Sequence, residues 1–161
     1  MLSEINNSSN VGFETILSGT VDATMMAMTL EIPAIALSQV TNEDNQPTNW
    51  DCVKHHAQSI ITKLLSLSTP QNICCNVKFP ACSAHQVKGL KITKQGDSDV
   101  SRFVVMPTQD PQGNDYLWFR AKRNLQILDD NKEFDAVNAN FIAITPLGYE
   151  RTNYTFYKNL L

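Results

Sequence analysis

A short run near the start of the sequence, Ser18-Gly19-Thr20, has the chemistry of an anion site. It directly precedes a stretch of helical periodicity and therefore falls at a predicted helix N-terminus, where unpaired backbone N–H groups and the helix dipole attract negative charge. Gly19 leaves room for an anion to approach the backbone, and the two hydroxyl groups add donors. The alternative interpretation is an ordinary N-cap formed by Ser18 or Thr20.

The segment before this run, residues 3–12, is rich in asparagine and serine. The side chains of these residues carry short, neutral oxygen ligands that suit a hard cation such as Mg²⁺ or Mn²⁺. Taken alone, such a segment is equally typical of a turn.

The cysteines and histidines lack the spacing of a zinc site. Zinc ligands come in pairs such as C-x2-C or H-x3-H, whereas Cys74 and Cys75 are adjacent, as are His55 and His56. We find no secretory context that would turn the four cysteines into disulfides. We therefore expect buried free thiols, with a Cys/His nucleophile pair as the alternative. His85, in a loop, could act as an acid or base, but we interpret it as a surface residue.

Helices and buried strands alternate along the chain. Apolar residues at helical spacing predict helices over residues 20–31 and 48–64, the second preceded by a possible capping box, Thr48-x-x-Asp51. A short helix is expected at 134–138, and the apolar tail is weakly helical. Strands are predicted at residues 32–37, 73–79, 90–93 and 141–146.

A β-hairpin is predicted between residues 100 and 120. Its two β-rich runs flank Asp110-Pro111-Gln112-Gly113, in which proline and glycine occupy favourable turn positions. Together with the alternating helices and strands, this pattern predicts an α/β fold.

The composition is that of a protein with a substantial core. The chain has 161 residues, of which 42% are apolar, and 13 basic residues against 16 acidic ones give a net charge of -3. This charge provides no electrostatic basis for binding a nucleic acid polymer. No apolar run approaches the ~18 to 20 residues of a membrane span, and the first residues do not resemble a signal peptide. We expect a cytoplasmic protein with no membrane partner.

Several motifs, in their order and spacing, resemble a known family. In chain order they are Ser3-x-Ile5-Asn6, Asn10-x-Gly12, Ser18-Gly19-Thr20-Val21-x-Ala23, Ile32-Pro33-Ala34-Ile35-Ala36-Leu37-Ser38, Asn76-Val77-x-Phe79-Pro80, Lys88-Gly89-Leu90-Lys91-Ile92-Thr93, Asp110-Pro111-x-Gly113 and Ile144-Thr145-Pro146-Leu147. This arrangement resembles the SurE (stationary-phase survival) proteins, which are metal-dependent 5'/3'-nucleotidases. The resemblance covers nearly the whole chain and corresponds to the carboxy-terminal portion of the family, lacking its amino-terminal Asp-Asp segment.

The resemblance implies an incomplete SurE-like, Rossmann-type three-layer α/β/α sheet with an extended β-hairpin and a C-terminal tail for oligomerisation. On this interpretation the chain is a single domain that assembles into a homodimer or homotetramer. Residues 1–95 would form part of the α/β core, 96–122 the hairpin, 123–148 the return to the core and 149–161 the tail. We also expect apolar area to be exposed along the edge where the family's first strands would pair.

The resemblance further implies hydrolysis of nucleoside 5'- and 3'-monophosphates to nucleoside and phosphate, assisted by Mg²⁺ or Mn²⁺. Asn6 corresponds to the family's asparagine metal ligand, and Ser18, Gly19 and Thr20 to its phosphate-binding turn. The family's other metal ligands, two aspartates and a serine, have no counterpart here, so we expect metal binding to be weakened or lost. The alternative is a catalytically inactive remnant that acts at most as an oligomerisation or anion-binding domain.

Two departures from the family bear on this site. The family has glycines where this chain has Glu4 and Ser8, and these residues would strain a loop that needs positive φ there. Asp129-Asp130 could replace the absent aspartates, but the residues that follow are typical of a solvated turn.

Overall fold

The computed structural model describes residues 1–41, 47–68, 70–96, 101–123 and 132–160. The connection from the hairpin to the core at 124–131, which contains Asp129 and Asp130, therefore lies outside the described residues. Helices and strands follow in the order β1 Leu2–Asn6, α1 Gly19–Thr29, β2 Ile35–Gln39, α2 Asp51–Leu65, β3 Cys74–Phe79, β4 Leu90–Ile92, β5 Ser101–Gln109, β6 Asp115–Arg123, α3 Glu133–Asn138, β7 Ile142–Leu147 and α4 Tyr154–Asn159, with short 3-10 helices η1 Gly12–Leu17 and η2 Ala84–Gln86.

Five strands form one mixed sheet in the order β1-β2-β3-β7-β4. β1, β2 and β3 are parallel, β7 runs antiparallel to β3, and β4 is parallel to β7. The carboxyl ends of β1, β2 and β3 therefore lie at one edge of the sheet. The loop that joins β1 to α1, which carries the asparagine-rich segment, leaves from that edge.

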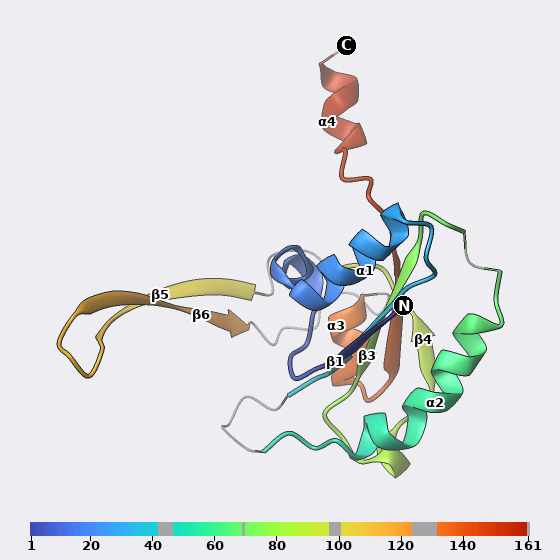
Figure 1. The fold of residues 1–161 in the computed structure, drawn as a ribbon, viewed down its shortest axis with the longest axis horizontal. Helices are drawn as coiled ribbons and strands as arrows, with labels where there is room; N and C mark the ends of the chain where they lie inside the picture. The colour runs from blue at the N-terminus through green and yellow to red at the C-terminus, as the bar shows by residue number, and fades with distance from the viewer. Residues whose placement is uncertain (42–46, 69, 97–100, 124–131, 161) are drawn as a thin grey trace.

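Helices cover both faces of this sheet, which gives three layers (Figure 1). On one face, alternate strand residues such as Leu37, Val77 and Ile144 pack against α2. On the other face, Ala36 and Cys74 pack against α1, while a smaller cluster involves α3. The three-layer α/β/α architecture expected from the sequence is thus confirmed. Among the described residues, no helix is both long and apolar enough to span a membrane.

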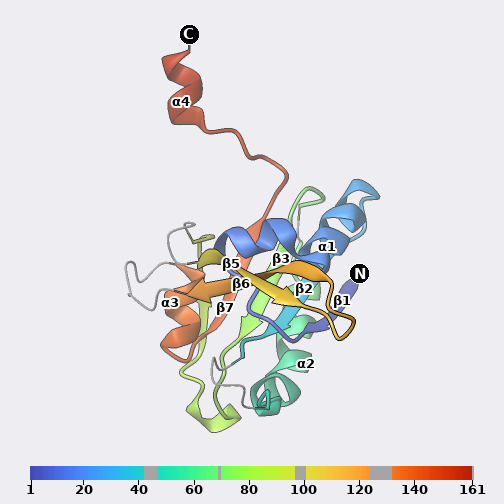
Figure 2. The same cartoon turned by 90° about the vertical axis from the view of Figure 1, so that its left-hand side faces the viewer.

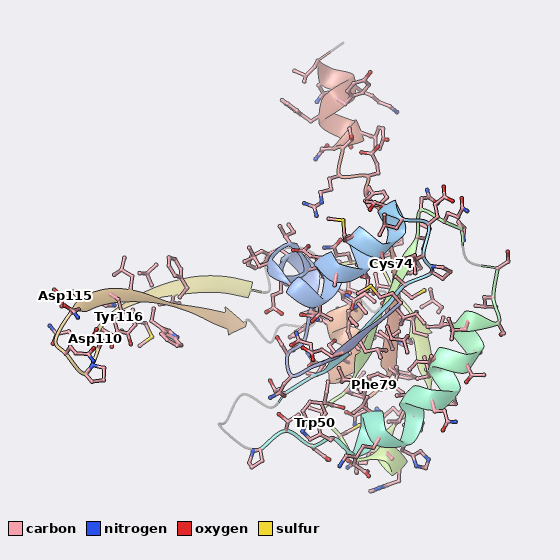
Figure 3. All side chains as sticks on the ribbon, in the orientation of Figure 1. Trp50, Cys74, Phe79, Asp110, Asp115 and Tyr116 are labelled. Carbon is pink, nitrogen blue, oxygen red and sulfur yellow. The ribbon has the colours of Figure 1, made fainter. Side chains whose placement is uncertain are left out.

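The β5–β6 hairpin and α4 extend away from this core. The hairpin is an antiparallel ribbon of nine paired positions that projects to one side, and α4 stands off at the end of an extended segment (Figures 1 and 2). Residues at the far end of the hairpin, such as Asp115 and Tyr116, lie far from the core residues Cys74 and Phe79 (Figure 3). The large apolar side chains that are described in the two extensions, such as Leu117 and Phe156, are exposed.

β1 was not predicted from the sequence, for a geometric reason. Its two large apolar residues, Leu2 and Ile5, are an odd number of positions apart, and the pairing of β1 with β2 shifts register between them. The strand therefore lacks the alternation that marks a half-buried strand. Both side chains are exposed at the free edge of the sheet, as expected for the edge where further strands would pair.

Two local expectations were wrong. Thr48 and Asp51 form no capping box, because α2 begins after Trp50 without a side-chain cap. Instead the Thr48 hydroxyl donates to Asn7 Oδ1 at 2.6 Å, and the Asp51 carboxylate accepts from the Ala84 N–H at 2.7 Å. Glu4 and Ser8 do not introduce strain either, since neither residue has a positive φ.

Packing of α2 on the sheet predicts different costs for two adjacent leucines. Leu64 is buried in the core cluster, whereas Leu65 is exposed on the same helix. We expect Leu64→Ala to lower the free energy of unfolding by about 2–4 kcal/mol, because it removes buried methyl groups and leaves a cavity. Leu65→Ala should change it by less than about 0.5 kcal/mol. Equilibrium urea unfolding measures both values, and equal midpoints for the two variants would contradict this packing.

Candidate functional site

The N-terminus of α1 is capped by Ser18. The Ser18 backbone is extended, and its Oγ accepts a hydrogen bond from the Val21 N–H at 3.2 Å, which is the usual geometry of an N-cap. The first amide groups of a helix have no acceptor within the helix, so those of Gly19 and Thr20 are available at this end. α1 has eleven residues, which is long enough to give its N-terminus the partial positive charge of the helix dipole.

Gly19 keeps the space in front of these amides open. A Cβ built at this position would meet no atom within 4 Å, and Gly19 does not have a positive φ. The backbone conformation therefore does not require glycine here. What glycine provides is an uncovered backbone that a ligand can approach closely.

Asn10 connects the candidate residues at the two ends of this loop. Its Oδ1 accepts hydrogen bonds from Asn6 Nδ2 and from Ser18 Oγ, both at 3.0 Å. The structure therefore brings the predicted metal-ligand position Asn6 next to the predicted phosphate-binding position Ser18. We did not select Asn10 as a site residue from the sequence, although the Asn10-x-Gly12 motif contains it.

Several buried polar atoms around Asn10 have unmet hydrogen-bonding capacity. Among the described residues, Asn10 Nδ2 finds no acceptor and Ser9 Oγ no partner, although both residues are almost fully buried. Asn76 Oδ1, next to the loop, is also unpartnered within the described part of the chain. Buried donors and acceptors of this kind are normally satisfied by a ligand or an ordered water molecule.

A divalent cation does not fit the described residues by themselves. Asn6 Nδ2 is bound to Asn10, which leaves Asn6 Oδ1 as one neutral ligand at the end of β1. The described residues contain no group of three or more His, Cys, Asp or Glu side chains that could hold a metal ion. Mg²⁺ and ions like it prefer several oxygen ligands, carboxylates among them. One amide oxygen does not make such a centre.

The cysteines do not form a nucleophilic centre. All four are free thiols. Burial raises the pKa of Cys52 to about 12, and nearby Cys82 and Asp51 add to this shift. Burial likewise raises the pKa values of Cys74, Cys75 and Cys82. These thiols are therefore protonated near neutral pH and are poor nucleophiles.

His85 lies exposed in η2, which contacts α2. The loop that contains η2 is tied to α2 by the Asp51–Ala84 hydrogen bond. The interpretation of His85 as a surface residue agrees with this placement.

A three-layer α/β sheet with an open helix N-terminus beside the carboxyl ends of its parallel strands is typical of proteins that bind phosphate groups. The family model described as "Survival protein SurE" matches residues 1–102, and the chain belongs to the SurE family.

Relatives and a solved structure agree with this assignment. "5'-nucleotidase SurE 1" of Burkholderia lata is 36% identical over 153 residues, which are 95% of this chain and 59% of the relative. "5'-nucleotidase SurE" of Paramagnetospirillum magneticum is 38% identical over 153 residues, which are 95% of this chain and 58% of the relative. The crystal structure of SurE protein from Aquifex aeolicus matches with a TM-score of 0.76 and 29% identity, covering 99% of this chain and 62% of that one. The chain thus spans about 60% of the length of the relatives that it matches.

Proposed function

We propose that this chain provides the phosphate-binding part of a SurE-type nucleotidase that hydrolyses nucleoside 5'- and 3'-monophosphates. Ser18, Gly19 and Thr20 are the phosphate-binding residues. The observation that carries the proposal is the open N-terminus of α1, whose cap Ser18 shares the acceptor Asn10 with Asn6. The names of the relatives, which are 5'-nucleotidases, support this choice of substrate class.

These residues act through hydrogen bonds to the phosphoryl oxygens. The amides of Gly19 and Thr20 and the Thr20 hydroxyl donate to the bound phosphate. Because they are fixed at the helix end before the reaction, they stabilise the negative charge that grows on the phosphoryl oxygens in the transition state. The reaction adds water across the ester bond and releases nucleoside and phosphate.

A metal ion would add charge stabilisation and help to generate the attacking group. Asn6 is the residue of this chain that would contribute to such a site. Since the described residues do not complete a divalent centre, we assign phosphate binding and charge stabilisation to this chain and assign no step of water activation to it.

The alternative function is binding without hydrolysis. On this interpretation the chain is an oligomerisation or anion-binding domain, which the absence of an acidic cluster among its described residues favours. For either function, we propose that residues 1–95 and 123–148 form the core of one domain. The hairpin at 96–122 and the tail at 149–161 would join subunits into a homodimer or homotetramer.

Apolar side chains on both faces of the hairpin support this assembly. Met106, Trp118 and Tyr116 lie on one face, and Leu117 and Phe119 on the other, as the cross-strand pairing requires. Exposed fractions reach 59% for Leu117 and 65% for Phe119. A two-stranded ribbon is at best marginally stable alone in water, so we expect another subunit to cover it.

Replacing one donor of the helix N-terminus tests phosphate binding. Gly19 is the first residue of α1, a position where proline fits the helix but removes the N–H, and the extended Ser18 backbone suits a residue before proline. We expect Gly19→Pro to weaken binding of a nucleoside 5'-monophosphate by roughly tenfold or more, the value of a charge-assisted hydrogen bond. Gly19→Ala keeps the N–H and meets no neighbouring atom, so it should bind like the parent chain. Calorimetric titration measures the affinity of each variant for the nucleotide. Equal affinities of Gly19→Pro and Gly19→Ala would contradict phosphate binding at this site.

Hydrolysis by the isolated chain separates the two functions. We expect no release of phosphate from nucleoside monophosphates in Mg²⁺ or Mn²⁺ above the metal-free control, because Asn6 alone cannot hold the ion. A colorimetric phosphate assay measures the rate. Robust metal-dependent turnover that disappears in Asn6→Ala would contradict this expectation and show that the chain completes a metal centre.

Removing one apolar side chain from the hairpin tests the assembly. We expect Phe119→Ser to raise the dissociation constant between subunits at least about tenfold, because each subunit loses the burial of one large aromatic side chain. Gln112→Ser, at the turn, is the control and should leave assembly unchanged. Light scattering over a concentration series gives the mass of each variant. A mass that does not respond to Phe119→Ser would argue against the hairpin as the contact.

A further inference from the structure

The backbone of Gly12 is held on both sides by side chains that are distant in the sequence. Its N–H donates to Glu133 Oε1, and its carbonyl oxygen accepts from Gln95 Nε2 at 2.8 Å. Gln95 Nε2 also donates at 2.7 Å to Oγ1 of Thr15, which lies three residues further along η1. Three parts of the chain thus meet at Gly12.

The loop around Gly12 has an unusual backbone that needs such support. Asn10 has φ of 44° and Gly12 has φ of 54°, both in the left-handed region, which asparagine and glycine tolerate better than other residues. The Asn10 carbonyl accepts from Asn76 Nδ2 at 3.0 Å. The conformation of this loop determines where the Asn10 side chain lies, and therefore whether Asn10 can accept from both Asn6 and Ser18.

Glu133 is itself held in place. It is fully buried, and its Oε2 accepts from Lys78 Nζ at 2.5 Å and from Thr145 Oγ1 at 2.9 Å. Lys78 Nζ also lies 2.8 Å from Thr145 Oγ1. Burial lowers the pKa of Lys78, and the charge of Glu133 opposes that shift. Oε2 of Glu133 is thus bound to side chains of the sheet, and Oε1 accepts from the Gly12 N–H.

We propose that Glu133 and Gln95 are positioning residues for the phosphate site. Neither touches the ligand. They fix Gly12, which sets the conformation of Asn10, which in turn orients Ser18 and Asn6. The inference rests on the proposed function, because it assumes that phosphate binds at the N-terminus of α1.

Gln95→Ala tests this without disturbing the core, since Gln95 is at the surface. We expect its affinity for inorganic phosphate, measured by calorimetric titration, to fall about three- to tenfold, with only a small decrease in the thermal unfolding midpoint. Gln86→Ala is the matched control: Gln86 is also exposed and also holds two groups, the Ser83 N–H and hydroxyl, away from the site. It should bind phosphate like the parent chain.

Glu133→Asp tests the other side of Gly12. Aspartate keeps the negative charge near Lys78, but it is one methylene shorter and withdraws the acceptor from the Gly12 N–H. We expect faster hydrogen exchange of the Gly12 amide in NMR spectra, together with weaker phosphate binding. Gln95→Ala should shift the same amide resonance, whereas Gln86→Ala should not.

These measurements separate two failures. If the parent chain binds no phosphate, the proposed function fails, while the Gly12 exchange rates still decide whether Glu133 and Gln95 hold the loop. If the parent chain binds phosphate and both Gln95→Ala and Glu133→Asp bind it equally well, the positioning role is overturned. Equal weakening by Gln95→Ala and Gln86→Ala would overturn it as well.

Discussion

The ion pair between Lys78 and Glu133 is removed from water, and much of the structure around the candidate site follows from this constraint. Burying two charges costs several kcal/mol per ion unless each finds good partners, so every donor and acceptor of the pair must be matched. Thr145 and the Asn76 carbonyl provide these partners on the sheet. The remaining acceptor of Glu133 is matched by the backbone of the loop that carries Asn10.

This constraint divides one face of the sheet into two halves. Beneath α1 the face is apolar, with Ala36 and Cys74 in the core cluster. Towards the carboxyl ends of β2 and β3 the same face turns polar, through Ser38, Asn76 and Lys78. An apolar helix would leave these side chains without partners, whereas the asparagine-rich loop covers them, because the carbonyls of Ser9 and Asn10 accept from Ser38 and Asn76. The loop is thereby placed next to the N-terminus of α1.

The sequence predicts the parts of this arrangement that depend on neighbouring residues. Helical periodicity and cap chemistry are local, so α1 and α2 are predicted correctly, and of the two predicted cap residues, Ser18 and Thr20, the structure has Ser18. The proposed capping box of α2 fails because Thr48 and Asp51 find partners from other parts of the fold.

The contacts of Glu133 could not be predicted at all, because they depend on the topology of the sheet. β7 returns antiparallel beside β3 and sets Thr145 opposite Asn76, and α3 then brings Glu133 over Lys78. Lysine is rarely fully buried, but helices on both faces of the sheet leave Lys78 of the central strand β3 without exposure to solvent. Asn10 was not identified as a site residue from the sequence for a similar reason, because its importance comes from joining Asn6 to Ser18.

The position of Asn6 limits how a metal centre could form. Asn6 ends β1, which pairs with β2 on one side and has a free edge on the other. Among the described residues, the polar half of the sheet on the β2 and β3 side offers Ser38, Asn76 and Lys78, which carry neutral or positive groups. None of these described groups is a carboxylate. The carboxyl end of a strand lying parallel to β1 would be beside Asn6, because parallel strands present these ends at the same edge. A complete centre at Asn6 thus depends on acidic groups that the described residues do not gather there.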